Sequence, residues 1–340
     1  MKTEDHFLHQ LYDETSFLRE KQAAGESPAQ TKERQKQFLS DSLGTFALQE
    51  GHTPVLLERV ECDGYIRERI ELCAVPGLTF GAYVLIPTER SHQLEGVMAV
   101  HGHGYGSRQI CGMLEDGEID EGEPGIYNHF AVQLVRKGML VIAPDVIGFG
   151  ERRMEADVAE STSSCYRMST HLLMMGKTLT GLRVKEMRHV LDYFRTRKEI
   201  DPNRIGIAGF SGGSLIAYVT AALDDRIRAA LLIGFPNTFK ASILAIHHCL
   251  CNYTPGLLTQ AELPELIGLL APRPLFLESG DRDPIFPAAG FEQAVNELQE
   301  IYRQEGAEDR IAVDLFPGKH EVSGRRSFDW LQAQLVNLVE

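Results

Sequence analysis

The chain has 340 residues, of which 43% are hydrophobic, and it carries a formal net charge of −14. This length suits one large α/β domain or a domain with an extension, and the acidic balance without a basic stripe argues against nucleic acid or an anionic membrane surface as a partner. The N-terminus, MKTEDHFLHQ, lacks the apolar core of a signal peptide, and no run of about 18 apolar residues predicts a membrane span.

The first predicted element is a helical extension over residues 1–44, joined to a main domain over 45–340. A polar break, AAGESPAQ, divides the extension into two helices. The first helix carries a loose apolar stripe. We expect the extension to pack on the main domain. The stripe consists of Phe7, Leu8, Leu11, Phe17 and Leu18.

Strands open the main domain, and Pro76-Gly77 predicts a hairpin between the second and third. Apolar runs then alternate with helical patterns, which is typical of a parallel sheet. The predicted strands are 55–62, 65–74, 78–86, 97–100, 140–143, 204–210, 229–234, 275–278 and 311–316. The predicted helices are 127–137, 179–197, the segment after 211, 288–303 and one from 325. The fold class is therefore α/β, with a mixed, mostly parallel sheet and helices on both faces.

One stretch, RIGIAGFSGGSLIAYV (204–219), changes from strand to helix at a serine. Ser211 has a glycine two places before it and another two places after it. A sharp strand-to-helix turn projects such a hydroxyl above the sheet edge, and side chains at the flanking positions would collide with backbone. The pattern predicts a nucleophile at Ser211.

A serine nucleophile needs a histidine base and an acid that orients it. LFLESGDRDPIFP ends a strand near Glu278 and offers Asp281 and Asp283, of which we favour Asp283 because Pro284 and an apolar turn follow it. His320, in VDLFPGKHEVSG, follows the last strand. The order Ser211, Asp283, His320 is the one expected for a nucleophile elbow on this type of sheet.

The oxyanion that forms during acyl transfer requires backbone donors. The N–H of Gly212, directly after the serine, supplies one. The glycine-rich loop in VMAVHGHGYG (97–106) follows a predicted strand, and we assign the second donor to the N–H of His103.

The nucleophile, acid, histidine and oxyanion-loop motifs resemble those of the α/β-hydrolase superfamily. In this chain they are, in that order, GFSGG, SGDRDPIFP, PGKHE and VHGHG. Within it, APDVIGFGERR, EIDPNRIGIAGFSGG and LLAPRPLFLESGDRDPIFP are similar to the dienelactone-hydrolase and acetyl-xylan-esterase-like branch. The resemblance spans about residues 50–340. It implies ester hydrolysis through an acyl-enzyme without metal or cofactor. Dienelactone hydrolase itself carries cysteine at the nucleophile position, whereas this chain has Ser211.

Two long segments, 151–177 and 235–270, are expected to form pocket walls or lids above the catalytic edge. Their aromatic, methionine and histidine residues suit a small ester better than a long acyl chain. Packing between loops is an equal alternative for each of these side chains. The pocket candidates are Tyr105, Tyr166, Met175, His247 and Tyr253.

The sequence HHCLC (247–251) resembles a metal cluster, but zinc pairs usually have two or more intervening residues and no second Cys/His pair stands nearby along the chain. We therefore predict no metal. Six cysteines without a secretion signal predict reduced thiols in the cytoplasm. They are Cys62, Cys73, Cys111, Cys165, Cys249 and Cys251.

The function predicted from these residues is hydrolysis of small-molecule esters with short acyl or acetyl groups. Two alternatives stay open: a serine peptidase of the same fold, and a catalytically inactive binding protein. The chain offers no room for the large cap or propeller that such peptidases often add. The sequence does not decide between a monomer and a homo-oligomer.

Overall fold

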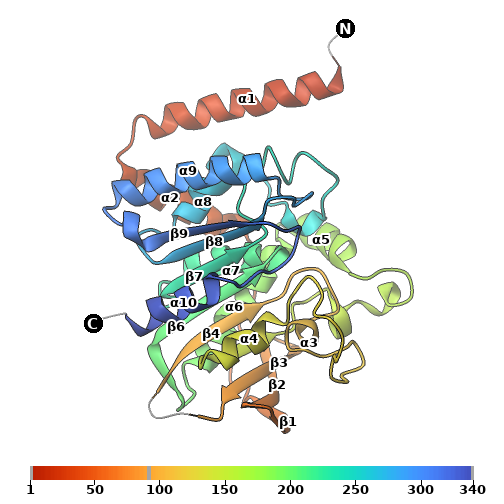
Figure 1. Cartoon of the computed structure of the whole chain (residues 1–340). Helices are drawn as coiled ribbons and strands as arrows, with labels where there is room; N and C mark the ends of the chain where they lie inside the picture. The colour runs from red at the N-terminus through yellow and green to blue at the C-terminus, as the bar shows by residue number, and fades with distance from the viewer. Residues whose placement is uncertain (1–2, 90–92, 338–340) are drawn as a thin grey trace.

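The computed structural model describes residues 3–89 and 93–337, and one nine-stranded sheet runs through it (Figure 1). The inner strands are almost wholly buried, which is why they are continuous apolar runs in the sequence. The strands are β1 (Val55–Cys62), β2 (Tyr65–Val75), β3 (Leu78–Pro87), β4 (Leu94–Val100), β5 (Leu140–Pro144), β6 (Ile200–Phe210), β7 (Ala229–Ile233), β8 (Leu275–Gly280) and β9 (Ile311–Phe316).

Ten α-helices are found in the described residues. They are α1 (Glu4–Ala23), α2 (Pro28–Ser42), α3 (Ser107–Ile110), α4 (Phe130–Arg136), α5 (Cys165–Met174), α6 (Leu179–Phe194), α7 (Gly212–Leu223), α8 (Leu263–Gly268), α9 (Ala288–Gln304) and α10 (Ser327–Val336). Short 3₁₀ turns are η1 (Gly150–Arg152), η2 (Glu155–Asp157), η3 (Leu250–Asn252), η4 (Leu257–Thr259) and η5 (Glu308–Arg310). The sequence did not predict α3, α5 or α8.

The strand order is β1-β2-β3-β5-β4-β6-β7-β8-β9. The β1–β2–β3 part is antiparallel, and β3 also pairs antiparallel with β5, while all pairs from β5 through β9 are parallel. Helices α4 and α10 pack on one face, and α6, α7 and α9 pack on the other. The predicted mixed, mostly parallel sheet with helices on both faces is confirmed.

The parallel strands place their carboxyl ends at one edge of the sheet, where the loops after β4, β6, β8 and β9 meet. The first long segment also lies at this side, toward the right in Figure 1, where α5 is labelled, whereas the end of the second segment forms α8 near α2 and α9. Ligands of open α/β sheets bind at such an edge. Among the described helices, none combines the length and the apolar character needed to cross a membrane.

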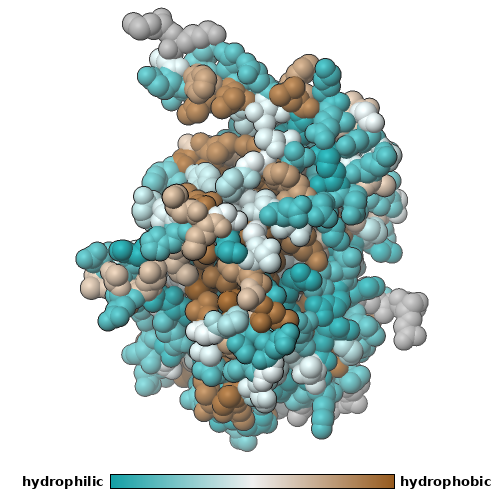
Figure 2. All heavy atoms as spheres, turned by 180° about the vertical axis from the view of Figure 1, so that it is seen from behind, coloured by the Kyte–Doolittle hydropathy of each residue, from teal (hydrophilic) through white to brown (hydrophobic). Residues whose placement is uncertain are grey.

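Helix α1 lies along the outside of the molecule (Figure 1). It contacts the body through polar side chains: Tyr12 donates to Glu262 at 2.9 Å, and the buried Arg19 donates to the Leu258 carbonyl at 3.0 Å. The apolar residues of the predicted stripe are instead 48–64% exposed. Figure 2 shows hydrophobic surface on this helix at the top of the molecule. The extension therefore contacts the main domain through polar side chains of α1, while the apolar stripe of this helix faces solvent.

Candidate active site

The turn between β6 and α7 holds Ser211 in a backbone conformation that side chains rarely adopt, with φ 55° and ψ −123°. The flanking glycines are required by close approach. A Cβ atom on Gly209 would overlap the Gly213 carbonyl, and one on Gly213 would overlap the Val100 carbonyl. Because β6, α7 and the end of β4 are in such close contact, the Ser211 side chain projects away from the turn. It is half-buried at the edge of the sheet.

Ser211 is the first member of a hydrogen-bonded series. The Oγ atom of Ser211 lies 2.9 Å from Nε2 of His320, and Nδ1 of His320 lies 2.7 Å from Oδ2 of Asp283. The Asp283 side chain is fully buried, while the imidazole is 14% exposed. With Nδ1–H donating to the carboxylate, Nε2 is free to accept the serine proton.

The two candidate aspartates occupy different places. Asp283 accepts hydrogen bonds from the backbone N–H groups of Ile285 and Phe286 at 2.8 and 3.0 Å, so its carboxylate is held rigidly toward the histidine. Asp281 is half-exposed and accepts from the Gly318 N–H at 3.0 Å. The structure thus brings Asp283 to His320 and leaves Asp281 bracing the turn after β9.

The loop that carries His320 is anchored by a residue that the sequence analysis did not single out. Glu278, at the end of β8, accepts from the N–H groups of Ser323 and Gly324 at 2.9 and 3.1 Å and from the Ser327 hydroxyl at 2.6 Å. Burial raises the pKa of Glu278 although these donors oppose the shift. In the sequence, the only sign of this role was an acidic residue at the end of an apolar strand.

Aromatic rings surround the imidazole of His320. The ring centroid of Phe210 is 4.7 Å away and that of Phe286 is 5.7 Å away. His248, from the second long segment, lies edge-on to Phe286 at 5.8 Å. Burial lowers the pKa of His248 to about 4, so this imidazole is neutral at pH 7.

The loop after β4 passes directly against the serine turn. A Cβ atom on Gly102 would lie 2.7 Å from the Phe210 carbonyl oxygen and 3.1 Å from the nitrogen of Gly212. The Tyr127 hydroxyl donates to the carbonyl of His103 at 2.8 Å and so fixes the peptide that follows. In the described part of the chain, the N–H groups of His103 and Gly212 have no hydrogen-bond acceptor. Both are free for a ligand.

The side chain of His101 also holds the loop after β4 in place. It is completely buried, its Nδ1 donates to the Gly102 carbonyl at 2.8 Å, and its Nε2 accepts from the Val146 N–H at 3.0 Å. Burial lowers the pKa of His101 to about 4. The neutral imidazole therefore joins the β4 loop to the end of β5.

The predicted pocket residues are dispersed. Tyr105 and Tyr253 are half-buried, and their hydroxyls donate to the carbonyls of Met113 and Ile243 at 2.9 and 3.0 Å. Tyr166 and Met175 are 74% and 61% exposed, and His247 is exposed as well. Tyr166 lines a separate surface cleft beside η2 and α5. Neither tyrosine hydroxyl binds Ser211, and the role of all five residues in substrate binding stays a prediction.

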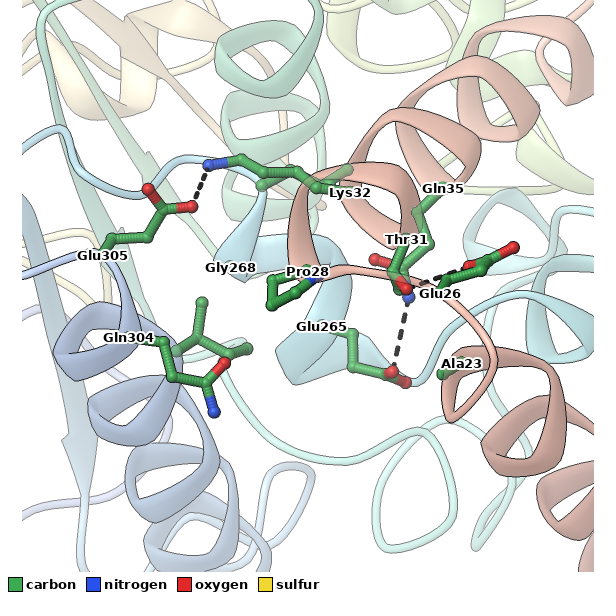
Figure 3. Close-up of a pocket in the computed structure, with 12 residues that line it drawn as sticks. Ala23, Glu26, Pro28, Thr31, Lys32, Gln35, Glu265, Gly268, Gln304 and Glu305 are labelled. Carbon is green, nitrogen blue, oxygen red and sulfur yellow. Dashed lines mark hydrogen bonds and ion pairs between the residues drawn. The ribbon is translucent and has the colours of Figure 1, made fainter.

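A cleft of about 270 Å³ lies away from this edge, between the N-terminal helices and helices α8 and α9 (Figure 3). It is crossed by an ion pair between Lys32 and Glu305 and by a hydrogen bond from Gln35 to Glu265. None of Ser211, Asp283 and His320 lines it. The cleft reflects the docking of the N-terminal helices.

Next to the β4 loop, the fold gathers four sulfur and nitrogen ligands from distant parts of the chain: His103, Cys165, Cys249 and Cys251. Burial disfavours the charged imidazole, but hydrogen bonds to Cys165 and Cys249 raise the pKa of His103 to about 9. Hydrogen bonds from Cys249 and Cys251 lower the pKa of the Cys165 thiol. The prediction of no metal was based on the short spacing between the Cys and His residues of 247–251. In the folded chain, His103 and Cys165 join Cys249 and Cys251 from distant positions in the sequence.

A serine at a strand-to-helix turn, on the carboxyl edge of a mostly parallel sheet, defines the molecule as an α/β hydrolase. A family model described as "Abhydrolase family" matches residues 29–313, and the chain belongs to this family. The predicted superfamily is confirmed.

Individual relatives agree with this assignment. A Bacillus subtilis (strain 168) protein named "Putative hydrolase YtaP" is 31% identical over 238 residues, which cover 68% of this chain and 75% of the relative. A solved structure titled "putative acetyl xylan esterase" from Bacteroides fragilis has a TM-score of 0.71 at 20% identity, covering 84% of this chain and 74% of its own. Acetyl xylan esterase 1 from Thermoanaerobacterium sp. has a TM-score of 0.59 at 17% identity, covering 91% and 94%. At these identities the two structures establish a shared fold.

Proposed function

We propose that this protein is a serine esterase that cleaves carboxylic esters with short acyl or acetyl groups through an acyl-enzyme. The observation that carries the proposal is the pair of hydrogen bonds, 2.9 and 2.7 Å long, that joins Ser211 to His320 and His320 to Asp283. A serine alone is a weak nucleophile, and this arrangement is the one that activates it.

In the proposed mechanism, Oγ of Ser211 attacks the ester carbonyl while Nε2 of His320 takes the hydroxyl proton. Asp283 stabilises the imidazolium that forms. The free N–H groups of Gly212 and His103 donate to the oxyanion, and each such donor is worth about 3 to 4 kcal/mol in comparable sites. His320 then protonates the leaving alcohol and activates a water molecule, which attacks the acyl-enzyme and returns the proton to Ser211.

Hydrolysis of short esters is supported by the surroundings of the serine. The rings of Phe210 and Phe286 pack against the imidazole, and the neutral His248 packs edge-on against Phe286, which gives a mixed apolar and polar environment. Two solved structures of the same fold are titled acetyl xylan esterases, which makes acetylated sugars a substrate class to test. A small-molecule ester, with no metal in the chemical step, is the partner we propose.

Labelling with a fluorophosphonate probe tests the nucleophile. Wild-type protein should be labelled once, with the adduct on the tryptic peptide that contains Ser211, and Ser211→Ala should not be labelled. Ser161→Ala is the matched control, because this exposed serine lies outside the site. Equal labelling of Ser211→Ala would contradict the proposal, and complete lack of labelling of wild type would favour the inactive binding protein.

A p-nitrophenyl ester series in detergent-free buffer tests the substrate class. We expect kcat/KM for acetyl to butyryl esters to exceed that for acyl chains of about eight carbons by roughly tenfold, since each misfitted methylene costs about 1 kcal/mol or more. Efficiency that rises steadily beyond eight carbons would contradict a small pocket. Faster cleavage of aminoacyl-p-nitroanilides than of p-nitrophenyl acetate would favour the peptidase alternative.

A further inference from the structure

The four-residue cluster beside the β4 loop is assembled from three separate parts of the chain. His103 follows β4, Cys165 is the first residue of α5 in the first long segment, and Cys249 and Cys251 lie at η3 in the second. One ligand atom from each residue lies within 4.8 Å of every other. Cys165 and Cys251 are buried, and His103 and Cys249 are half-buried. All of the cysteines are free thiols.

The spacing of these atoms is that of a tetrahedral metal site. The Cys251 Sγ atom lies 3.6 Å from Nε2 of His103 and 3.2 Å from Sγ of Cys249. With Zn–S bonds of about 2.3 Å and Zn–N bonds of about 2.0 Å, tetrahedral ligand atoms are about 3.5 Å apart for S and N and about 3.8 Å apart for two sulfurs. Shifts of about 1 Å or less bring all four atoms to these separations.

A buried arginine supplies a second, independent observation. Arg183 is 1% exposed and donates to the Ile147 carbonyl at 2.9 Å and to the Cys165 sulfur at 3.2 Å, with its guanidinium over the Phe149 ring. Within the described residues it forms no ion pair with a carboxylate. A buried cation without a counter-charge is strongly destabilising. Among the residues that the structure describes, the cluster lies in direct contact with Arg183 through Cys165 and can carry the balancing negative charge.

We propose that His103, Cys165, Cys249 and Cys251 bind one Zn²⁺ ion as a Cys₃His site. Three thiolates and Zn²⁺ carry a net charge of −1, which Arg183 neutralises. Three Zn–S bonds and one Zn–N bond form, and the protons held by these groups in the metal-free chain are released to solvent. Because the protein fills all four positions, the site is structural and no position is left for water or substrate.

The zinc site would tie both long segments to the loop that approaches the serine. Zinc bound at Nε2 leaves the proton of His103 on Nδ1. A Cβ atom built on Gly212 would lie 3.3 Å from that Nδ1, so this edge of the ring faces the residue after the nucleophile. The metal would thus fix both the position and the tautomer of His103. This consequence rests on the proposed esterase function, whereas the metal site itself does not.

Metal content provides the direct test. Protein produced with added zinc and purified in reducing buffer without chelator should contain about one Zn²⁺ per chain by inductively coupled plasma mass spectrometry. Cys251→Ser should lower the content at least fivefold. Cys62→Ser, a half-buried cysteine in β1 outside the cluster, is the matched control and should retain the metal. Equal zinc in both variants would overturn the proposal.

Cobalt substitution keeps the test independent of whether a variant folds. Wild-type protein stripped of metal and titrated with Co²⁺ should develop the thiolate-to-cobalt absorption of a tetrahedral site, saturating at one equivalent. His103→Gln should weaken or shift these bands. A wild-type titration without such bands, or freshly reduced protein that holds no zinc when zinc is added in excess, would overturn the proposal. Neither readout depends on esterase activity, so this proposal and the proposed function can fail separately.

Discussion

The Ser211–His320–Asp283 series and the four-residue cluster around Cys251 lie at the same edge of the sheet but are positioned differently. Each member of the series follows a strand of the sheet within a few residues, so hydrogen-bonded backbone fixes its place. The cysteines of the cluster lie on two long segments outside the sheet. We infer that the sheet holds the reacting groups and that the cluster orders the loops around them.

This difference separates the expected effects of substitution. Removing a member of the series should abolish chemistry while the fold persists, because β6, β8 and β9 do not depend on these side chains. Removing a member of the cluster should loosen the long segments and reduce catalysis only indirectly.

Ser211→Ala should lower kcat for p-nitrophenyl acetate by about 10⁵- to 10⁶-fold, the scale found when a serine hydrolase loses its nucleophile. The thermal midpoint should stay the same or rise, because alanine at this strained position removes no buried packing. Steady-state kinetics and differential scanning fluorimetry measure the two quantities. Turnover near the wild-type value in a clean preparation would remove Ser211 from the proposed mechanism.

Asp283→Asn should lower kcat by about 10⁴-fold, because an amide favours the wrong tautomer of His320. The oxygen of the introduced amide can still accept from the N–H groups of Ile285 and Phe286, so the local turn should survive. Far-ultraviolet circular dichroism would confirm that the fold is retained. A loss of less than tenfold would mean that another group orients the histidine.

Most of the geometry of the candidate site could be predicted from the sequence, because each of its residues lies a few positions beyond a predicted strand. GFSGG identifies the turn, and Asp283 and His320 each follow a buried apolar run that reads as a parallel strand. Glycine at positions 209 and 213 was expected from crowding, and the close approaches to backbone carbonyls show why. Because each residue follows the end of its strand by only a few positions, the strand largely determines where the residue lies.

The cluster and the N-terminal helix could not be predicted in the same way. Cys165 approaches Cys251 through segments whose path no periodic pattern determines, so spacing along the chain gave no sign of their contact. In α1, Tyr12 and Arg19 bind Glu262 and the Leu258 carbonyl, which lie 250 and 239 residues away along the chain, and the apolar stripe stays exposed. Both results depend on long-range contacts that no local window contains.

Cys251→Ser should lower kcat by about 10- to 100-fold, less than the roughly 10²- to 10³-fold loss that follows complete removal of an oxyanion donor. The reason is that the backbone of His103 stays anchored through Tyr127 while its side chain loses the metal. The thermal midpoint should fall by several degrees, as a loss of about 2 kcal/mol implies for a chain of this size. Cys62→Ser should change neither quantity.

Prolonged incubation of wild type with a zinc-selective chelator should reproduce the Cys251→Ser effect, and added Zn²⁺ should reverse it. Chelation that leaves both kcat and the midpoint unchanged, after loss of the metal has been verified, would show that the cluster does not order the loops. Loss of all activity would instead give the metal a direct part in the chemistry.

Asp281→Asn should have the smallest effect, a reduction in kcat of about threefold or less. Asp281 lies only two residues before Asp283, but it accepts from the Gly318 N–H rather than from the imidazole, and an amide oxygen can replace that acceptor. Its ion pair with Arg282 is exposed and therefore worth about 1 kcal/mol or less. Measuring Asp281→Asn beside Asp283→Asn compares the same chemical change at two neighbouring positions. If Asp281→Asn lowered kcat more than Asp283→Asn did, the acid of the proposed mechanism would have to be reassigned to Asp281. The hydrogen bond between Asp283 and His320 would then not identify the carboxylate that orients the histidine.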